Sequence, residues 1–335
     1  MTYYRPIAQT DPARPSGALP LAGGWCWFSH VEVLRRDGPP QVIAAADLPE
    51  GWRARLTAPR PALGPLAMDR PQIMGILNVT PDSFSDGGQH AQAGRALSHA
   101  RAMAEAGAAI IDVGGESTRP GAVDVPAEEE IARTAPVIEA MRREIGVPVS
   151  IDTRKATVAR AAVAAGAGLF NDVAGFTFDP ALLPYAAQTG LPVCVMHARG
   201  DPATMQHNPV YEDVLLDVYD YLEARVAALE AAGIPRARIA VDPGIGFGKT
   251  IAHNLALLAR ISLFHGLGCP VLLGASRKKF ISVIGKAPDP MGRAPGSVAV
   301  ALGGIAQGVQ ITRVHDVEAT AQALRLWRAV TLGDW

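Results

Sequence analysis

The stretch MGILNVTPDSFSDGG, from Met74 to Gly88, decides the fold of this chain. Residues 74–79 are apolar or β-branched at most positions, which is typical of a strand buried on both faces. Pro81 ends this run, and the polar residues and paired glycines after it predict a loop. A buried strand that delivers Asn78 and then a polar loop to one rim predicts the first unit of a β/α barrel.

Seven further apolar runs end in polar or charged residues. They are IIDVGGESTRPG (110–121), VPVSIDTRK (147–155), LFNDVAGF (169–176), PVCVMHARG (192–200), IAVDPGIGFGKT (239–250), VLLGASRKK (271–279) and VQITRVHD (309–316). Helical patterns lie between them, the clearest over 211–232, so the order is that of parallel βαβ units. Because a (β/α)8 TIM barrel builds its active site from the loops after its strands, we expect that α/β fold over residues 71–335.

Residues 1–70 form a separate N-terminal extension in the sequence. Val31–Leu34 and Gln41–Ala45 flank a turn that contains Gly38, which predicts a β-hairpin. The segment is too small to bury its large apolar side chains alone; these are Trp25, Trp27, Phe28 and Trp52. We expect the extension to pack against the barrel, over the barrel's N-terminal face.

The composition of the 335 residues is that of a soluble globular protein, with 49% apolar and 19% charged residues. A net charge of -1 gives no electrostatic reason to expect a nucleic-acid or membrane partner. Three widely spaced cysteines and the absence of a signal-peptide pattern favour a reducing cytoplasm. We therefore expect a cytoplasmic protein that acts on small molecules.

Two cationic residues mark the last strand as a phosphate site. Arg313 and His315 are two positions apart, so they lie on the same side of the strand. A helix that Asp316 can cap follows them, and free amides at a helix N-terminus favour phosphate.

Two acidic residues that end apolar strands are further candidates. At Asp152 an unpaired carboxylate would be costly, and the structural alternative is an ion pair with Arg154 or Lys155. Asp242 precedes a proline, and the alternative for it is a turn-forming role.

Eight motifs occur in a fixed order over about residues 72–332. They are NVTPDSFSDGG, DVGGESTRPGA, SIDT, ND, MH, DPGIGFGK, GASRK and RVHD. Together they resemble the dihydropteroate synthase family, pterin-binding (β/α)8 enzymes of folate biosynthesis. The resemblance implies a transferase that joins 6-hydroxymethyl-7,8-dihydropterin pyrophosphate to 4-aminobenzoate, giving 7,8-dihydropteroate and pyrophosphate. It also implies a homodimer and competition by sulfonamides.

The same resemblance implies roles for individual residues. Residues implied to bind the pterin are Asp152, Asn171, Met196, Asp242, Phe247 and Lys278. Residues implied to bind pyrophosphate are Asn78, Arg119, Arg313 and His315, with Asn78 also contacting a Mg²⁺ ion that the substrate helps to hold. Residues implied to bind 4-aminobenzoate are Phe84, Ser117, Thr118, Pro120 and Lys279. Catalytic roles are implied for Asp152, Lys278, Arg313 and His315.

The chemistry of the implied reaction is consistent with these residue types. A dihydropterin presents two adjacent N–H groups, which a carboxylate such as Asp242 accepts in bidentate fashion. Positive charge that develops when pyrophosphate leaves would be stabilised by the anion of Asp152. Lys279 is a departure, because many relatives have Ser at that position. Two alternatives remain open: a pterin-binding methyltransferase, which would not need Arg313 or His315, and a non-catalytic pterin-binding paralogue.

Overall fold

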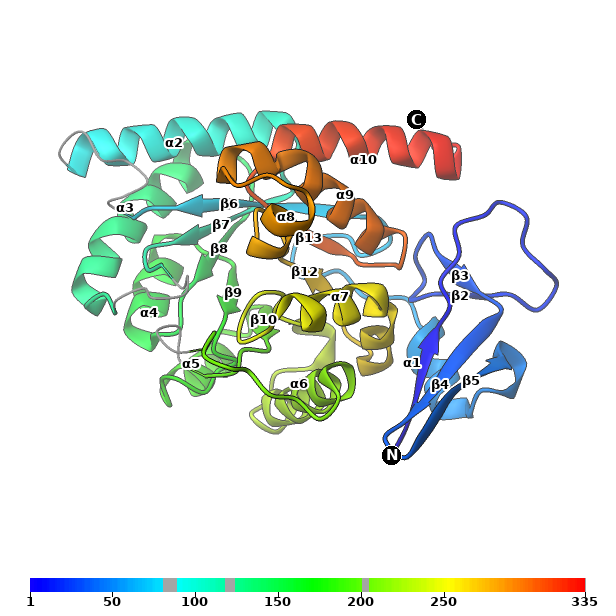
Figure 1. Ribbon diagram of the computed structural model, residues 1–335. Helices are drawn as coiled ribbons and strands as arrows, with labels where there is room; N and C mark the ends of the chain where they lie inside the picture. Colours follow the sequence, from blue (N-terminus) through cyan, green and yellow to red (C-terminus); the bar gives the residue numbers. More distant parts are fainter. Residues whose placement is uncertain (81–88, 118–123, 201–204, 335) are drawn as a thin grey trace.

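The computed structural model describes residues 1–80, 89–117, 124–200 and 205–334. At its centre eight parallel strands follow one another around a ring (Figure 1). They are β6 (Gln72–Asn78), β7 (Ile110–Gly114), β8 (Val149–Asp152), β9 (Leu169–Asp172), β10 (Val193–Met196), β11 (Ile239–Asp242), β12 (Leu272–Leu273) and β13 (Ile311–Val314). A bridge between Val241 and Val271 joins β11 to β12 and closes the ring. The predicted (β/α)8 barrel is therefore confirmed.

Helices cover the outside of the barrel. They are α2 (Gln89–Ala106), α3 (Ala127–Glu144), α4 (Ala156–Ala165), α5 (Leu182–Thr189), α6 (Val214–Ala231), α7 (Ile251–Ala259), α8 (Lys279–Ile284), α9 (Ala294–Ile305) and α10 (Val317–Leu332). The carboxylate of Asp213 accepts the free amides of Leu215 and Leu216, which fixes the start of α6. No described helix has both the length and the apolar composition needed to cross a membrane.

The side chains inside the barrel form layers, because alternate residues of a strand point to the same side. The layer nearest the strand starts is apolar and contains Met74, Ile110, Leu169, Cys194, Ala240, Leu272 and Ile311. Two residues further along the same strands stand Ile76, Asp112, Asn171, Met196, Asp242, Gly274 and Arg313. The period of two thus places acids, an amide and a cation together, directly above an apolar floor.

The N-terminal extension contains its own small sheet. Its strands β1 (Thr2–Pro6), β4 (His30–Arg35) and β5 (Gly38–Ala44) pair in the order β1-β4-β5. A two-stranded ribbon, β2 (Leu19–Pro20) with β3 (Trp27–Phe28), and helix α1 (Glu50–Thr57) complete it. Figure 1 shows the extension, in blue, at the end of the barrel where β6 begins. Leu63, Leu66 and Met68 share one apolar cluster with the lowest barrel layer, so this last part of the extension seals that end.

Aromatic side chains fix the extension to the helices of the barrel. The hydroxyl of fully buried Tyr3 donates to both carboxylate oxygens of Asp220 in α6, at 2.8 and 2.9 Å. The Tyr3 ring packs edge-on against Tyr219, with the ring centroids 5.4 Å apart. The indole N–H of Trp25 donates to the carbonyl of Ile305, at the end of α9, at 2.8 Å. These contacts cover the apolar surface that the extension cannot bury within itself.

Candidate active site

A cavity of about 1120 Å³ lies at the ends of the barrel strands. The sequence-predicted residues that line it are Asn78, Ser117, Asp152, Phe247, Lys278, Lys279, Arg313 and His315. Three more predicted residues, Asn171, Met196 and Asp242, are almost completely buried in the barrel layer that carries Arg313. Phe84, Thr118, Arg119 and Pro120 lie outside the described residues. Polar groups from five strands, Asn78, Asp152, Asn171, Asp242 and Arg313, thus meet at one end of the barrel.

Arg313 lies at the electrostatic centre of this site. Its Nε donates to Oδ2 of Asp112 at 2.6 Å, and its Nη2 donates to Oδ2 of Asp152 at 2.7 Å. Burial raises the pKa of Asp152 above its usual value, and the Arg313 guanidinium opposes that rise. Burial lowers the pKa of Arg313, but the two carboxylates more than offset this and raise the pKa above its usual value. Arg313 is therefore a fixed cation held between two buried acids.

Sequence reasoning missed Asp112, which is completely buried in β7. Besides the hydrogen bond from Arg313, its carboxylate accepts hydrogen bonds from Nδ2 of Asn171 at 2.8 Å and from Oγ of Ser150 at 2.5 Å. The signal that could have found it was a carboxylate inside the apolar run IIDVGG, because a buried acid needs partners. The partners themselves come from strands that are distant in the sequence.

The alternative partners considered for Asp152 are engaged elsewhere. Arg154 Nε donates to Glu116 at 3.0 Å, and Lys155 Nζ lies 2.8 Å from Glu116 and 2.9 Å from Glu130. Both cations follow the end of β8 and pair with acids of the loop after β7 and of α3. The ion pair of Asp152 is therefore with Arg313, and the suggested pairing with its sequence neighbours is wrong.

Asp242 ends β11 with one oxygen engaged in a turn. Its Oδ1 accepts the amide of Gly244 at 2.7 Å, so the turn-forming role considered for it is real. A Cβ built on Gly274 would lie 3.4 Å from Oδ2, so the glycine leaves open space beside that second oxygen. Burial raises the pKa of Asp242, while the charge of Lys278 lowers it. The carboxylate therefore makes a structural bond through Oδ1, and its Oδ2 lies beside Gly274.

Lys278 crosses the loop that follows β11. Its ammonium lies 3.9 Å from the centroid of the Phe247 ring, a cation–π contact. Gly246 has a φ of 84°, and a Cβ there would come within 2.8 Å of Lys278 Cδ, so this crossing requires glycine. Burial lowers the pKa of Lys278 to about 7, against the opposing charge of Asp242. Lys278 therefore changes between its charged and its neutral form near neutral pH.

A buried lysine braces the same loop from behind. Lys249 Nζ lies 2.8 Å from Nδ1 of His197 and donates to the carbonyls of Gly244 and Phe247 at 2.9 and 3.0 Å. His197 is 4% exposed and packs edge-on against Tyr221. The histidine of the MH motif thus holds the loop and does not line the cavity.

At the end of β13, His315 and Asp316 can be compared with the roles predicted for them. His315 lines the cavity, with Nδ1 3.0 Å from Oγ of Ser276. Asp316 stands at the N-cap of α10, but its side chain makes no capping bond. Its carboxylate instead accepts Nε of Arg277 at 3.0 Å, so the predicted cap is wrong. The guanidinium outcompetes the backbone amides because a bidentate charged pair is the stronger interaction.

The surroundings of Asn78 test whether a metal ion fits beside its side chain. A Cβ built on Gly114 would lie 3.6 Å from Asn78 Oδ1 and 3.5 Å from Asp152 Cβ, so the glycine keeps the space between them open. Within the described part of the chain, no group of three or more His, Cys, Asp or Glu residues could hold a metal. Asn78 adds one amide oxygen to the cavity that Arg313 and His315 also line. This fits Mg²⁺, which takes few protein ligands and keeps substrate oxygens and waters.

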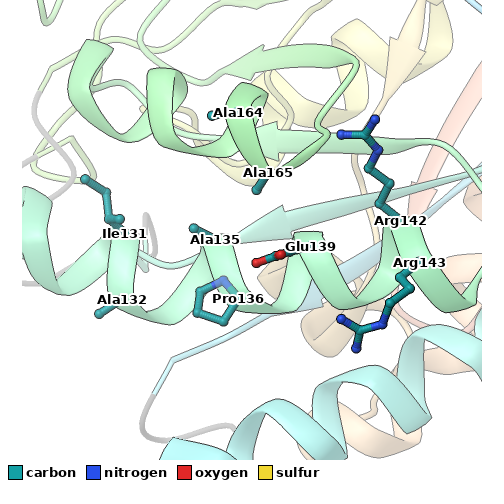
Figure 2. Close-up of a pocket in the computed structure, with 9 residues that line it drawn as sticks. All are labelled: Ile131, Ala132, Ala135, Pro136, Glu139, Arg142, Arg143, Ala164 and Ala165. Atoms are coloured by element: carbon teal, nitrogen blue, oxygen red, sulfur yellow. The ribbon is translucent and has the colours of Figure 1, made fainter.

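A second hollow lies on the outer surface, between α3 and α4. Figure 2 shows Glu139, Arg142 and Arg143 along α3, with Arg142 extending toward α4, which carries the small side chains of Ala164 and Ala165. Its volume is about 680 Å³. None of the charged groups at the strand ends reaches it, so the candidate site is the cavity at the barrel mouth.

The fold and the site define a class of protein. Residues 74–315 match the family model described as "Pterin binding enzyme", which is more than half of the chain. The chain therefore belongs to the pterin-binding enzymes, and within them its relatives are dihydropteroate synthases.

Dihydropteroate synthase of Escherichia coli strain K12 is 48% identical over 264 residues, covering 79% of this chain and 93% of that protein. Two solved structures have the same fold with a TM-score of 0.75. The Yersinia pestis dihydropteroate synthase with a sulfonamide drug is 47% identical and covers 79% of this chain and 96% of its own. The Xanthomonas albilineans enzyme with 4-aminobenzoic acid is 48% identical, with coverage of 79% and 94%. This chain belongs to the dihydropteroate synthase family.

Proposed function

We propose that this chain joins 6-hydroxymethyl-7,8-dihydropterin pyrophosphate to 4-aminobenzoate, giving 7,8-dihydropteroate and pyrophosphate. The observation that carries the proposal is the convergence of Asp242, Asn171 and Arg313 at the barrel mouth of a chain in this family. A carboxylate and an amide match the donors and acceptors of a pterin ring, and a guanidinium matches a diphosphate.

The pterin ring is bound through its polar edge and its faces. Asp242 accepts the two adjacent N–H groups, Asn171 reads the other ring nitrogens, and Lys278 donates to the ring carbonyl. Met196 and Phe247 pack on the flat faces of the ring, where apolar area is buried without unsatisfied polar atoms. The cation–π contact between Lys278 and Phe247 supports this arrangement, because it holds the ammonium beside the loop.

The reaction exchanges one bond for another at the methylene carbon of the pterin. The carbon–oxygen bond to pyrophosphate breaks, and the nitrogen of 4-aminobenzoate bonds to that carbon and loses a proton. Asp152 stabilises the positive charge that spreads into the ring as pyrophosphate leaves. Arg313 and His315 hold the departing diphosphate, together with Arg119. The amine is already a nucleophile, so the step needs no strong base.

The second substrate binds toward the outer part of the cavity. Ser117 and the exposed Lys279 line that cavity, and we assign them to the carboxylate of 4-aminobenzoate. Phe84, Thr118 and Pro120, which lie outside the described residues, keep the 4-aminobenzoate role that the resemblance implies for them. Because a Yersinia pestis relative is described with a sulfonamide drug, we expect sulfonamides to compete with 4-aminobenzoate here.

Magnesium enters this proposal through the diphosphate. Asn78 would hold a Mg²⁺ ion jointly with phosphate oxygens and waters. When bound, the ion neutralises negative charge on the leaving group. We expect Asn78→Ala to weaken the Mg²⁺ dependence of diphosphate binding, measured by calorimetry with and without the metal.

We further propose a cytoplasmic homodimer with a domain boundary near residue 70. The three cysteines are free and buried, which suits a reducing compartment. We assign the contact with a second copy to exposed apolar side chains on α7, on α8 and between α8 and α9; they are Leu255, Val283, Ile284 and Met291. Light scattering after size-exclusion chromatography should give a dimer for the wild type and a monomer for Leu255→Glu.

One assay tests the main proposal. The purified chain is incubated with the dihydropterin pyrophosphate, 4-aminobenzoate and Mg²⁺, and 7,8-dihydropteroate is detected by chromatography. Product formation that needs both substrates supports the proposal. A folded protein that binds the pterin but makes no product would instead be a binding module. Transfer of a methyl group from methyltetrahydrofolate to a corrinoid would point to a methyltransferase.

A further inference from the structure

Asp112 touches the machinery of the site without lining its cavity. It is 0% exposed, and its position on β7 faces Ser150 of the neighbouring strand. Its Oδ2 accepts Asn171 Nδ2 at 2.8 Å and Arg313 Nε at 2.6 Å, while Oδ1 accepts Ser150 Oγ at 2.5 Å. One carboxylate oxygen is therefore shared by a residue assigned to the pterin and a residue assigned to the diphosphate.

The bond to Asn171 determines how that amide is oriented. An ionised carboxylate only accepts hydrogen bonds, so the NH₂ group of Asn171 must face Asp112. The carbonyl oxygen of Asn171 then points the other way and is available as an acceptor for a ring N–H. A neutral partner at position 112 could donate as well as accept, and the amide could then turn around. Asp112 thereby selects one of two amide orientations.

The bond to Arg313 fixes a second group. A guanidinium has five N–H donors in one plane, and two of them are used by Asp112 and Asp152. These two bonds set the plane, so the donors that remain are held in a defined direction for phosphate oxygens. Asp152 alone would leave the guanidinium free to rotate about one contact.

We propose that Asp112 is a positioning residue that orients Asn171 toward the pterin and Arg313 toward the diphosphate. It touches neither substrate and acts through these two side chains. The inference rests on the proposed function of the site, and it adds a residue to which no substrate contact is assigned.

The test is a pair of double-mutant cycles read by ligand binding. In Asp112→Asn, affinity for 6-hydroxymethyl-7,8-dihydropterin and affinity for pyrophosphate should each fall about tenfold, because each ligand loses one oriented charge-assisted partner. In an Asn171→Ala background, Asp112→Asn should cause no further loss of pterin affinity. In an Arg313→Ala background, it should cause no further loss of pyrophosphate affinity. Such selective non-additivity is not produced by general loosening of the barrel.

Ser150→Ala is the matched control, since it removes a bond to the same carboxylate but leaves Oδ2 and its two partners in place. It should change both affinities less than twofold. If Asp112→Asn fails to fold, Asp112→Glu keeps the charge, displaces the carboxylate by one methylene, and should show the same non-additivity.

The results separate this inference from the proposed function. Additive losses in both cycles, in an enzyme whose wild type makes dihydropteroate, would overturn the role of Asp112 alone. A wild type that makes no dihydropteroate from both substrates would overturn the proposed function and the inference with it.

Discussion

Replacing Arg313 with alanine should destabilise the fold as well as the site. The guanidinium bridges Asp112 and Asp152 at 2.6 and 2.7 Å, and both carboxylates are buried. Removing one partner of a buried ion pair typically costs about 3–5 kcal/mol, because the remaining charge is uncompensated. Two acids are left here, so we expect Arg313→Ala to lower the free energy of unfolding by about 4 kcal/mol at pH 9.

The loss should depend on pH with a definite sign. Burial already raises the pKa of Asp152 to about 7, and without the guanidinium the pKa rises further. A carboxyl group whose pKa is raised on folding binds its proton more tightly in the folded state. The free energy of unfolding therefore decreases as pH rises from the unfolded-state pKa to the folded-state pKa. The variant can therefore neutralise its acid by taking up a proton as pH falls toward 7. We expect the destabilisation to be largest at pH 9 and clearly smaller at pH 6.5.

Guanidinium denaturation followed by tryptophan fluorescence at both pH values measures this effect. Arg36→Ala is the control, since Arg36 pairs with Asp217 and Asp220 on the surface of α6 and its side chain is 30% exposed. Its loss should be below about 1 kcal/mol at either pH. An Arg313→Ala protein as stable as the wild type, or one whose loss is the same at both pH values, would refute the buried bridge.

Three other changes probe separate parts of the molecule. Asp242→Ala should weaken binding of a pterin without phosphates about 100-fold, from loss of a bidentate charged contact, and unchanged calorimetric affinity would exclude that contact. Because burial lowers the pKa of Lys278 to about 7, kcat/KM should fall as pH rises above 7; Lys278→Arg should abolish that fall, and an identical profile would count against Lys278. Tyr3→Ala should lower the free energy of unfolding by about 3–5 kcal/mol with little effect on KM. The control Val42→Ala, at a side chain that is 62% exposed, should change the free energy of unfolding by less than about 0.5 kcal/mol. Equal effects of the two variants in melting experiments would contradict the anchoring of the extension.

Strand positions and the site end of the barrel were predictable from the sequence. Each apolar run forms a strand, and polar residues follow it. A continuous apolar run is typical of a strand that is buried on both faces, because neither face needs polar residues. Helix α6 occupies Val214–Ala231 within the amphipathic run expected over 211–232. The hairpin of β4 and β5 was predicted, but Gly38 does not lie in its turn as expected, because it pairs with Arg35 as the first residue of β5 and leaves Arg36 and Asp37 as the turn. All of these features leave a pattern within a short stretch of sequence, which is why they could be predicted.

Partners of charged groups were not predictable in the same way. Asp316 was expected to cap its own helix and binds Arg277, and Asp152 was compared with adjacent cations and binds Arg313. In both cases the carboxylate pairs with an arginine that is distant in the sequence, and not with its neighbours in the chain. The shared carboxylate of Asp112 could not be foreseen either, because Asn171 and Arg313 reach it only when the barrel closes.

Hydrophobic patterning and the two-residue repeat of a strand were enough to predict the eight strands, the layer period and the rim that carries the chemistry. The pairing of each acid with its cation, and the way in which the N-terminal extension closes the lower end of the barrel, emerge only in the folded chain. An ion pair or an aromatic contact depends on distance in space, and in a closed barrel residues 201 positions apart, such as Asp112 and Arg313, become direct neighbours.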